Sequence, residues 1–206
     1  MKAHTLAVLF LLVTVFSQAA TAAAYAPGYP GAYPRGVPGD KAVSNHPAAI
    51  VKAGIGKLQR FIKSGRAQNR EQALAFMAIE IEPYFDFAYM TRWAAGPAWR
   101  RMSPQQRADA EDKLKNAFMN TLAQQLVTYT DQPIRYFTPR GQDTNDMRVS
   151  AWIMQPNGIP TRLEFRFYLR DGEWKVFDVK AEGNSAVVHY RRQFREMFYP
   201  ERRTRY

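Results

Sequence analysis

Few side chains of this 206-residue sequence have the type and spacing needed for acid–base, nucleophilic or metal chemistry. The chain has no cysteine, which excludes thiolate metal sites, cysteine nucleophiles and disulfide bonds. It has only three histidines, so a histidine-based metal site or a two-histidine relay is not indicated. Ser185, His189 and Asp178 could be combined as a catalytic triad, but Ser185 and His189 fit better as the cap and one side of a final helix. We therefore expect no enzyme activity, no metal site and no cofactor.

Three charged residues, Asp86, Asp178 and Arg191, lie among apolar neighbours in the sequence. A buried carboxylate without a partner is strongly destabilising, so each of these residues needs one. We interpret Asp178 and Arg191 as a structural charge pair, and Asp86 as part of a salt bridge or a helix cap. An enzyme would instead need a charged acid or base inside a cavity. Whether Asp178 points into a pocket or pairs with Arg191 outside it distinguishes the two alternatives.

The elements that would position these residues are clearest near the C-terminus. Apolar and charged residues alternate over residues 162–170, which is typical of a half-buried strand. Asp171 and Gly172 then supply the positive φ angles of a tight primed turn, and the sequence returns as a partner strand. Asn184 or Ser185 caps the amphipathic C-terminal helix that follows. The sequence thus predicts a hairpin that leads directly into a helix.

Helices precede this hairpin in the chain. Apolar residues recur at helical spacing over residues 45–62 and over residues 73–81, after which Pro83 ends or kinks the helix. The Ser-Pro-Gln-Gln motif at residues 103–106 combines a cap, proline at the first helical position and Gln three residues later. It starts a third helix that we expect to run toward Tyr129.

Strand patterns follow at residues 134–138 and 147–154, before the hairpin. Helices first and an antiparallel sheet after them indicate an α+β fold rather than a parallel α/β fold. With 46% hydrophobic residues, the chain is long enough for one domain with a substantial core.

The ends of the chain differ in composition from this domain. Residues 1–24 have a basic start, an apolar segment and a small-residue cleavage site, so they predict a signal peptide and an exported protein. Residues 25–44, rich in Pro, Gly and Tyr, predict a disordered arm. We place the folded domain at residues 45–199 and a basic C-terminal tail at residues 200–206.

The formal net charge of +11 is high for an exported protein. It favours anionic membrane surfaces or acidic protein partners over nucleic acid. Arg191, Arg192 and Arg195, followed by the arginines of the tail, can make one basic end to the molecule. The alternative is that these arginines are ordinary solvated surface residues.

Four blocks of sequence carry a resemblance to a known family: residues 81–87 (IEPYFDF), 96–107 (GPAWRRMSPQQR), 174–179 (WKVFDV) and 183–194 (GNSAVVHYRRQF). In order and spacing they resemble the signatures of the MlaC family, also called the toluene-tolerance auxiliary component family. The resemblance covers residues 45–198.

The resemblance implies a curled antiparallel sheet of about four strands packed against several helices around an apolar lipid cavity. It also implies a periplasmic phospholipid carrier that maintains outer-membrane lipid asymmetry. Its partners would be phospholipid, an outer-membrane lipoprotein complex and an inner-membrane ATP-driven transporter, with transient membrane contact and no nucleic acid.

The chain departs from the family pattern at Ala186, where a larger aliphatic residue is usual, and at His189, where a small polar residue is common. These departures leave open which lipid is carried, for example a hopanoid, and which partner the protein docks to. The other alternative is an enzyme on a similar curled-sheet scaffold. The residues that we expect to line the lipid cavity are Phe87, Phe118, Leu122, Val149, Ala151, Ile153, Leu163, Phe165, Phe167 and Val176.

Overall fold

The centre of the sheet is a hairpin of two long strands, β3 (Thr161–Arg170) and β4 (Glu173–Ala181). The structure, a computed structural model, describes residues 46–126, 132–141 and 144–198. In this part of the chain the five antiparallel strands lie in sequence order, and the sheet is open. The other strands are β1 (Ile134–Tyr136), β2 (Met147–Ile153) and β5 (Asn184–Ser185).

The architecture confirms the predicted α+β class with an antiparallel sheet. The fifth strand is a two-residue addition to the four that the sequence predicts. The predicted signal peptide (1–24), arm (25–44) and basic tail (200–206) lie outside the described residues, as does the predicted helix end near Tyr129. No helix within the described ranges has the length and hydrophobicity to cross a bilayer.

The turn between β3 and β4 has the predicted primed geometry. Asp171 and Gly172 have φ angles of 51° and 81°, and they connect the paired residues Arg170 and Glu173. Two successive positive φ angles match the right-handed twist of the strands on either side. The Asp-Gly sequence therefore fixes the register from which the hairpin starts.

A β-bulge interrupts the register of this hairpin. Arg166 lies opposite Asp178 and Phe167 lies opposite Val176, so Phe177 is the extra residue on β4. A bulge breaks the alternation of side chains between the two faces of a strand. Phe177 and Asp178 can therefore both lie away from the face that carries Val176, although they are consecutive in the sequence.

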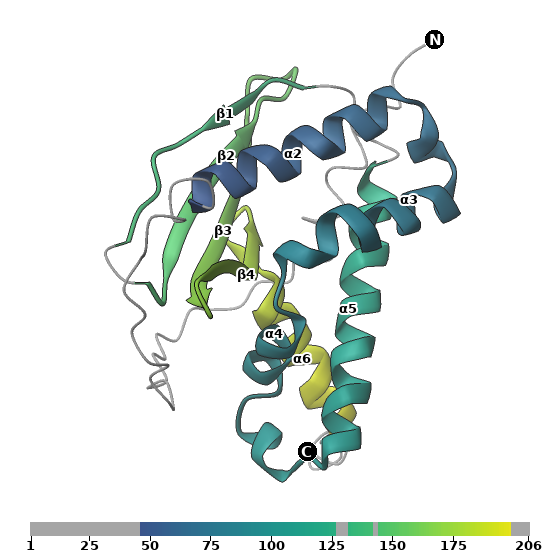
Figure 1. Cartoon of the computed structure of the whole chain (residues 1–206), viewed down its shortest axis with the longest axis vertical. Helices are drawn as coiled ribbons and strands as arrows, with labels where there is room; N and C mark the ends of the chain where they lie inside the picture. The colour runs from purple at the N-terminus through teal and green to yellow at the C-terminus, as the bar shows by residue number, and fades with distance from the viewer. Residues whose placement is uncertain (1–45, 127–131, 142–143, 199–206) are drawn as a thin grey trace, which may run out of the picture.

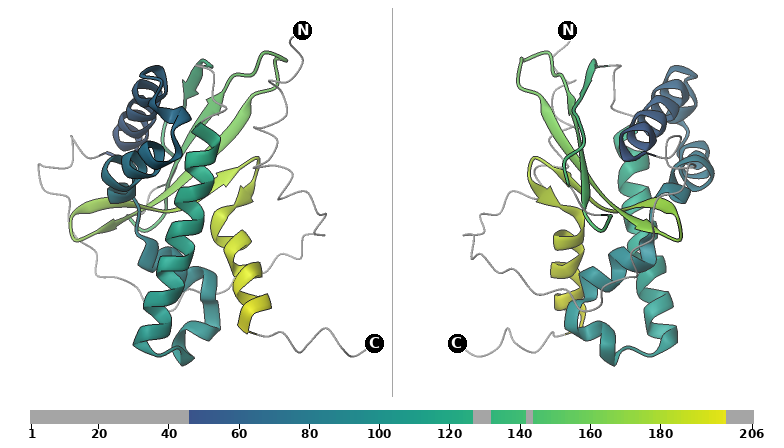
Figure 2. Two further views of the ribbon diagram at one scale, coloured as in Figure 1. Left: turned by 90° about the vertical axis from the view of Figure 1, so that its right-hand side faces the viewer. Right: turned by 60° about the vertical axis from the view of Figure 1, so that its left-hand side comes forward.

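The described residues form five α-helices. They are α2 (Pro47–Lys63), α3 (Arg70–Phe76), α4 (Phe87–Ala95), α5 (Pro104–Leu126) and α6 (Ala186–Phe198). The α2 helix lies across one face of the sheet, whereas α4, α5 and α6 pack together beside it (Figure 1). Two further views show α2 and α5 on the same side of the sheet (Figure 2).

Buried apolar residues form two clusters around this arrangement. The larger cluster lies among the helices and reaches Tyr168 and Phe177 of the hairpin. The smaller cluster joins Val51 of α2 to the sheet residues Val149 and Phe167. The two faces of the hairpin thus pack against different helices.

The start of α5 is set by the predicted capping box. The Ser103 hydroxyl accepts a hydrogen bond from the Gln106 N–H at 3.2 Å, and the Ser103 N–H donates to Gln106 Oε1 at 2.8 Å. Pro104 occupies the first helical position, where its missing N–H is not needed. These local bonds satisfy N–H groups that the helix itself leaves free.

The helix predicted over residues 73–81 changes its geometry before Pro83. It is α-helical only to the end of α3, and it continues as a π-helix over Met77–Ile81 and a 3₁₀ turn over Glu82–Tyr84. Proline has no N–H, and its ring clashes with the carbonyl group of the residue four positions earlier, here Ile79. A wider π turn relieves this conflict, and Pro83 ends the helix as predicted.

Asp86 combines the two predicted roles, a helix cap and a salt bridge. It is 6% exposed, and its Oδ1 accepts a hydrogen bond from the Tyr89 N–H at 2.8 Å at the start of α4. Its Oδ2 accepts from the Tyr168 hydroxyl and from the Arg170 guanidinium, the latter at 2.7 Å. One buried carboxylate therefore ties α4 to the hairpin.

We predict that Asp86→Ala lowers the free energy of unfolding by about 2–4 kcal/mol, because the Tyr168 hydroxyl and the Tyr89 N–H lose their acceptor. Arg170 is half exposed and adds little to this loss. Chemical denaturation measures the change. Asp112→Ala, at an exposed position of α5, is the control and should stay within about 0.5 kcal/mol of wild type. Equal losses in the two variants would contradict this role of Asp86.

Candidate functional site

A cavity of about 450 Å³ lies between α2, α5 and the inner face of the sheet. Its volume is within the range of pockets that bury most of a small ligand. The helices contribute a stripe of α2, the buried Met77 and Ile81 of the π-helical turn, and the C-terminal half of α5. Strands β3 and β4 contribute Leu163, Phe165 and Val179. The lining is mainly aliphatic and aromatic.

No Asp, Glu, Lys or Arg is among the described residues that line this cavity. Three of its lining residues, Tyr84, His189 and Tyr190, have ionisable side chains. Burial raises the pKa of Tyr190 to about 12, against a hydrogen bond with Thr121 that lowers it. Burial, and then the positive charge of Arg192, lower the pKa of His189. Both shifts favour the uncharged form of the side chain.

Uncharged polar side chains also line the cavity. Gln124 and Gln125 come from the last turns of α5, and Asn184 and His189 come from β5 and the start of α6. The His189 ring lies 2.9 Å from the Gln193 amide. These polar side chains can offer hydrogen bonds to a ligand.

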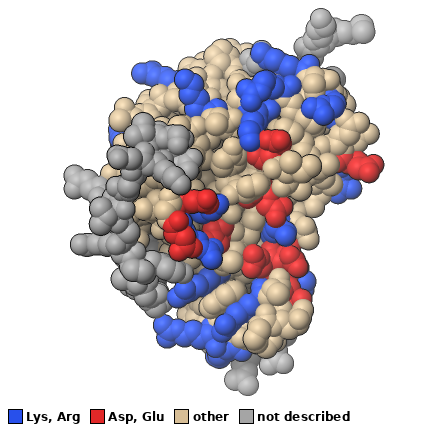
Figure 3. Space-filling view, viewed as in Figure 1, with Lys and Arg blue, Asp and Glu red and all other residues tan. Residues whose placement is uncertain are grey.

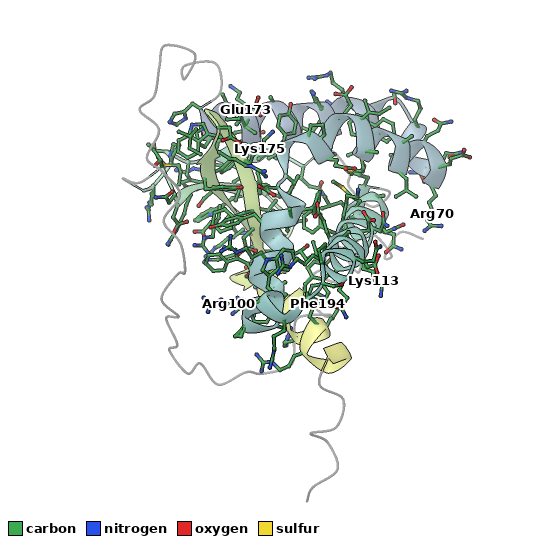
Figure 4. All side chains as sticks on the ribbon, turned by 60° about the horizontal axis from the view of Figure 1, so that its bottom comes forward. Arg70, Arg100, Lys113, Glu173, Lys175 and Phe194 are labelled. Atoms are coloured by element: carbon green, nitrogen blue, oxygen red, sulfur yellow. The ribbon has the colours of Figure 1, made fainter. Side chains whose placement is uncertain are left out.

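Charged side chains lie outside the cavity. On one face of the molecule Lys and Arg gather toward both ends, and Asp and Glu lie between them (Figure 3). Glu173 and Lys175, which form an ion pair of 2.8 Å, lie together by the hairpin turn, whereas Arg100 and Lys113 lie toward the other end of the molecule (Figure 4). The inside of the cavity and the surface thus differ sharply in charge.

The structure brings seven of the ten predicted lining residues to the cavity wall. The other three are buried elsewhere. Phe87 packs its ring 5.8 Å from Phe118 in the helical core, and Val149 and Ala151 lie under α2. Val149 and Ala151 share the inner face of the sheet with the lining residues, but α2 covers that part of the sheet. The seven that line the cavity are Phe118, Leu122, Ile153, Leu163, Phe165, Phe167 and Val176.

Sequence reasoning missed the contribution of α2 to the wall. Seven residues of this helix line the cavity at helical spacing, and the apolar period of the sequence was the signal that could have identified them. The sequence also gave no indication of the polar lining residues Gln124, Gln125, Asn184 and His189, because they come from three separate elements. The residues of α2 that line the cavity are Ile50, Val51, Gly54, Ile55, Leu58, Gln59 and Ile62.

The predicted charge pair of Asp178 and Arg191 is wrong. Asp178 is 2% exposed and accepts hydrogen bonds from the Ser185 hydroxyl at 2.7 Å and from the Val187 N–H at 3.1 Å. Arg191 instead donates to the Trp93 carbonyl group at 2.8 Å. The carboxylate is satisfied by N–H and O–H groups at the start of α6, and the cations that act on it are Arg166 and Lys180 rather than Arg191. Burial raises the pKa of Asp178, whereas its bonds with Ser185 and Val187 lower it.

The same geometry separates the residues of the possible triad. The Ser185 hydroxyl donates directly to Asp178 and accepts from the Val188 N–H at 3.1 Å, as the predicted cap of α6. His189 contacts Gln193 instead. A triad needs the histidine between the serine and the carboxylate, so these three residues do not form one. Asp178 does not line the cavity either.

The described part of the chain also holds no group of three or more His, Cys, Asp or Glu residues placed to bind a metal ion. What the arrangement can do is enclose apolar material. Its cavity presents apolar walls and some uncharged polar side chains, and no Asp, Glu, Lys or Arg is among its described lining residues.

An open antiparallel sheet and helices around an apolar, uncharged cavity define an α+β protein built to enclose an apolar ligand. The chain belongs to the MlaC family, since residues 53–201 match the family described as MlaC protein. This match confirms the resemblance identified in the sequence.

A similar solved structure is that of a phospholipid-binding protein from Ralstonia solanacearum, in complex with a phospholipid. The two proteins share 26% sequence identity and superpose with a TM-score of 0.65, over 72% of this chain and 85% of the other. No curated protein matches the chain.

We predict that Asp178→Ala lowers the free energy of unfolding by about 1–3 kcal/mol, because the Ser185 hydroxyl and the Val187 N–H lose a buried acceptor. Thermal and chemical denaturation measure the loss, and the exposed Glu173→Ala is the control. A pair with Arg191 would give a different result. In that case Arg191→Met would cost as much as Asp178→Ala, and the double variant would lose little more than either single one.

Proposed function

We propose that this protein binds a phospholipid, with the acyl chains in the cavity between α2, α5 and the sheet. The observation that carries the proposal is a cavity of about 450 Å³ whose described lining has no charged residue. Acyl chains are neutral, and burial of each methylene group is worth about 0.8 kcal/mol. Membership of the MlaC family and the phospholipid in the Ralstonia solanacearum structure support the same ligand class.

The function that follows from this site is transport rather than catalysis. Exposure of two long acyl chains to water is strongly unfavourable, so a carrier must enclose them in a cavity without water. Transport itself requires no catalytic group. We propose a periplasmic carrier that moves phospholipid between an outer-membrane lipoprotein complex and an inner-membrane ATP-driven transporter. The predicted signal peptide and the MlaC family support this assignment. The maintenance of outer-membrane lipid asymmetry and a role in toluene tolerance belong to the same proposal.

Mass spectrometry of an organic extract from the purified protein tests the ligand. The expected result is phospholipid in close to equal amount with the protein. A hopanoid in its place would support the alternative cargo, because an apolar cavity also suits a hydrocarbon ring system. An extract without lipid, from a protein that also fails to take up phospholipid from vesicles, would contradict the proposed function.

A charge placed on the cavity wall should remove the lipid. Leu163 lines the cavity, so Leu163→Glu would put a carboxylate among acyl chains, where it has no partner. We expect at least a tenfold loss of co-purifying lipid, measured by the same extraction. Arg162→Gln, one residue away on the exposed face of β3, is the matched control and should keep its lipid. Circular dichroism verifies that both variants are folded.

Salt should separate lipid retention from docking. The neutral lining predicts that the isolated protein retains lipid equally at low and physiological salt. Association with anionic vesicles should instead weaken with salt, because exposed charges are screened beyond about 10 Å. Replacing Arg202, Arg203 and Arg205 by Gln should weaken this association and leave lipid retention unchanged. Salt-independent association, or lipid loss from the tail variant, would count against a docking role for the basic residues.

A further inference from the structure

The cavity-facing stripe of α2 has a gap at its centre. The stripe places Ile50 and Val51 on one turn, and Ile55 and Leu58 toward the other end of the helix. Between them lies Gly54, which also lines the cavity but contributes no side chain. A large aliphatic residue would be the ordinary choice at a helical position that faces apolar space.

Glycine is an unfavourable residue at this position for the helix alone. In the interior of an α-helix it is destabilising relative to alanine, because it loses more conformational freedom on folding. Gly54 has no positive φ angle that would require glycine, unlike Gly65 or Gly172. The backbone of α2 therefore gives no reason for the missing side chain.

Close packing gives no reason either. A Cβ atom built on Gly54 would meet no atom within 4 Å, so the position borders open space. The next glycine of the helix, Gly56, differs in both respects. A Cβ atom there would lie 3.4 Å from the end of the Arg60 side chain, and Gly56 does not line the cavity. Only one of these two glycines faces the cavity, although both weaken the helix.

We propose that Gly54 is a specificity-determining residue, whose missing side chain leaves a recess in the α2 wall for the hydrocarbon of the cargo. This inference rests on the proposed function. Gly54 lines the same cavity as Leu163, Phe165 and Phe167 of the sheet, so the missing side chain leaves this cavity wider. The width decides how much hydrocarbon the cavity accepts. The ligand class favoured by this wall is therefore a lipid with long or bulky chains over one with short chains.

The test is a graded series at Gly54. Each cargo methylene that a new side chain displaces should weaken binding about fourfold. Gly54→Ala adds one carbon and should weaken uptake of dipalmitoyl phosphatidylcholine about fourfold, and Gly54→Leu on the order of 100-fold. Uptake of dioctanoyl phosphatidylcholine should fall much less, because short chains still fit the narrower cavity. Uptake into the delipidated full chain gives the affinities, from vesicles for the dipalmitoyl lipid and from monomeric lipid in solution for the dioctanoyl lipid.

Stability should change in the opposite direction. Replacing a helical glycine by alanine favours the helix, so the Tm of delipidated Gly54→Ala should rise by about 2–4 °C. Gly56→Ala and Gly56→Leu are the matched controls on the same helix. The alanine control should show the same rise in Tm, and both should bind long-chain lipid as wild type does. Loss of lipid together with a raised Tm cannot be explained by a damaged fold.

The outcomes separate this inference from the proposed function. Wild-type protein that takes up no phospholipid would overturn the proposed function itself. Normal lipid uptake by wild type, together with equal uptake by Gly54→Leu, would overturn only the role of Gly54. The same loss of long-chain and short-chain lipid in Gly54→Leu would overturn the selectivity for chain length, and an equal loss in Gly56→Leu would assign the effect to the helix rather than to the recess.

Discussion

The bulge between β3 and β4 is the constraint on which the two-sided structure depends. In a regular antiparallel pair, alternate residues of β4 would point to opposite faces of the sheet. Val176 and Asp178 would then lie on the same face. With Phe177 as the extra residue, β4 can give Val176 to the cavity and place both Phe177 and Asp178 on the other side. That side packs on the helices and receives the start of α6. A single hairpin therefore supports a filled core on one face and an open cavity on the other.

Two buried carboxylates connect the starts of helices α4 and α6 to the hairpin of β3 and β4. Asp86 accepts the N–H of Tyr89 at the start of α4, and Asp178 accepts the N–H of Val187 at the start of α6. Negative charge near a helix N-terminus is favourable, because the free N–H groups there carry partial positive charge. Both acids are thus satisfied away from the cavity, so the cavity lining can remain neutral without leaving a charge unpaired.

The sequence predicts those features of the fold and the cavity that depend on neighbouring residues, and not those that depend on contacts between distant parts of the chain. The strand period of β3 identified Leu163, Phe165 and Phe167, which all line the cavity, because alternation is a local property of the chain. The same pattern on β2 could not tell that α2 covers Ala151, since that contact joins residues far apart in the sequence. The sequence likewise showed that Asp178 needs a partner, but backbone N–H groups do not appear in a residue pattern, and a cation was the wrong partner to predict.

The sparse burial of α2 has a thermodynamic consequence. Of its seventeen residues only Pro47, Val51 and Phe61 are buried, because most of its apolar face borders the cavity rather than another element. The apolar face of α2 is therefore incompletely buried by the protein, and a bound lipid would bury the rest of it. Folding and occupancy then become linked equilibria, in which ligand stabilises the native state according to its concentration relative to Kd. A bound lipid would stabilise α2 against local opening, and amide hydrogen exchange along this helix would then be slower in the lipid-bound protein.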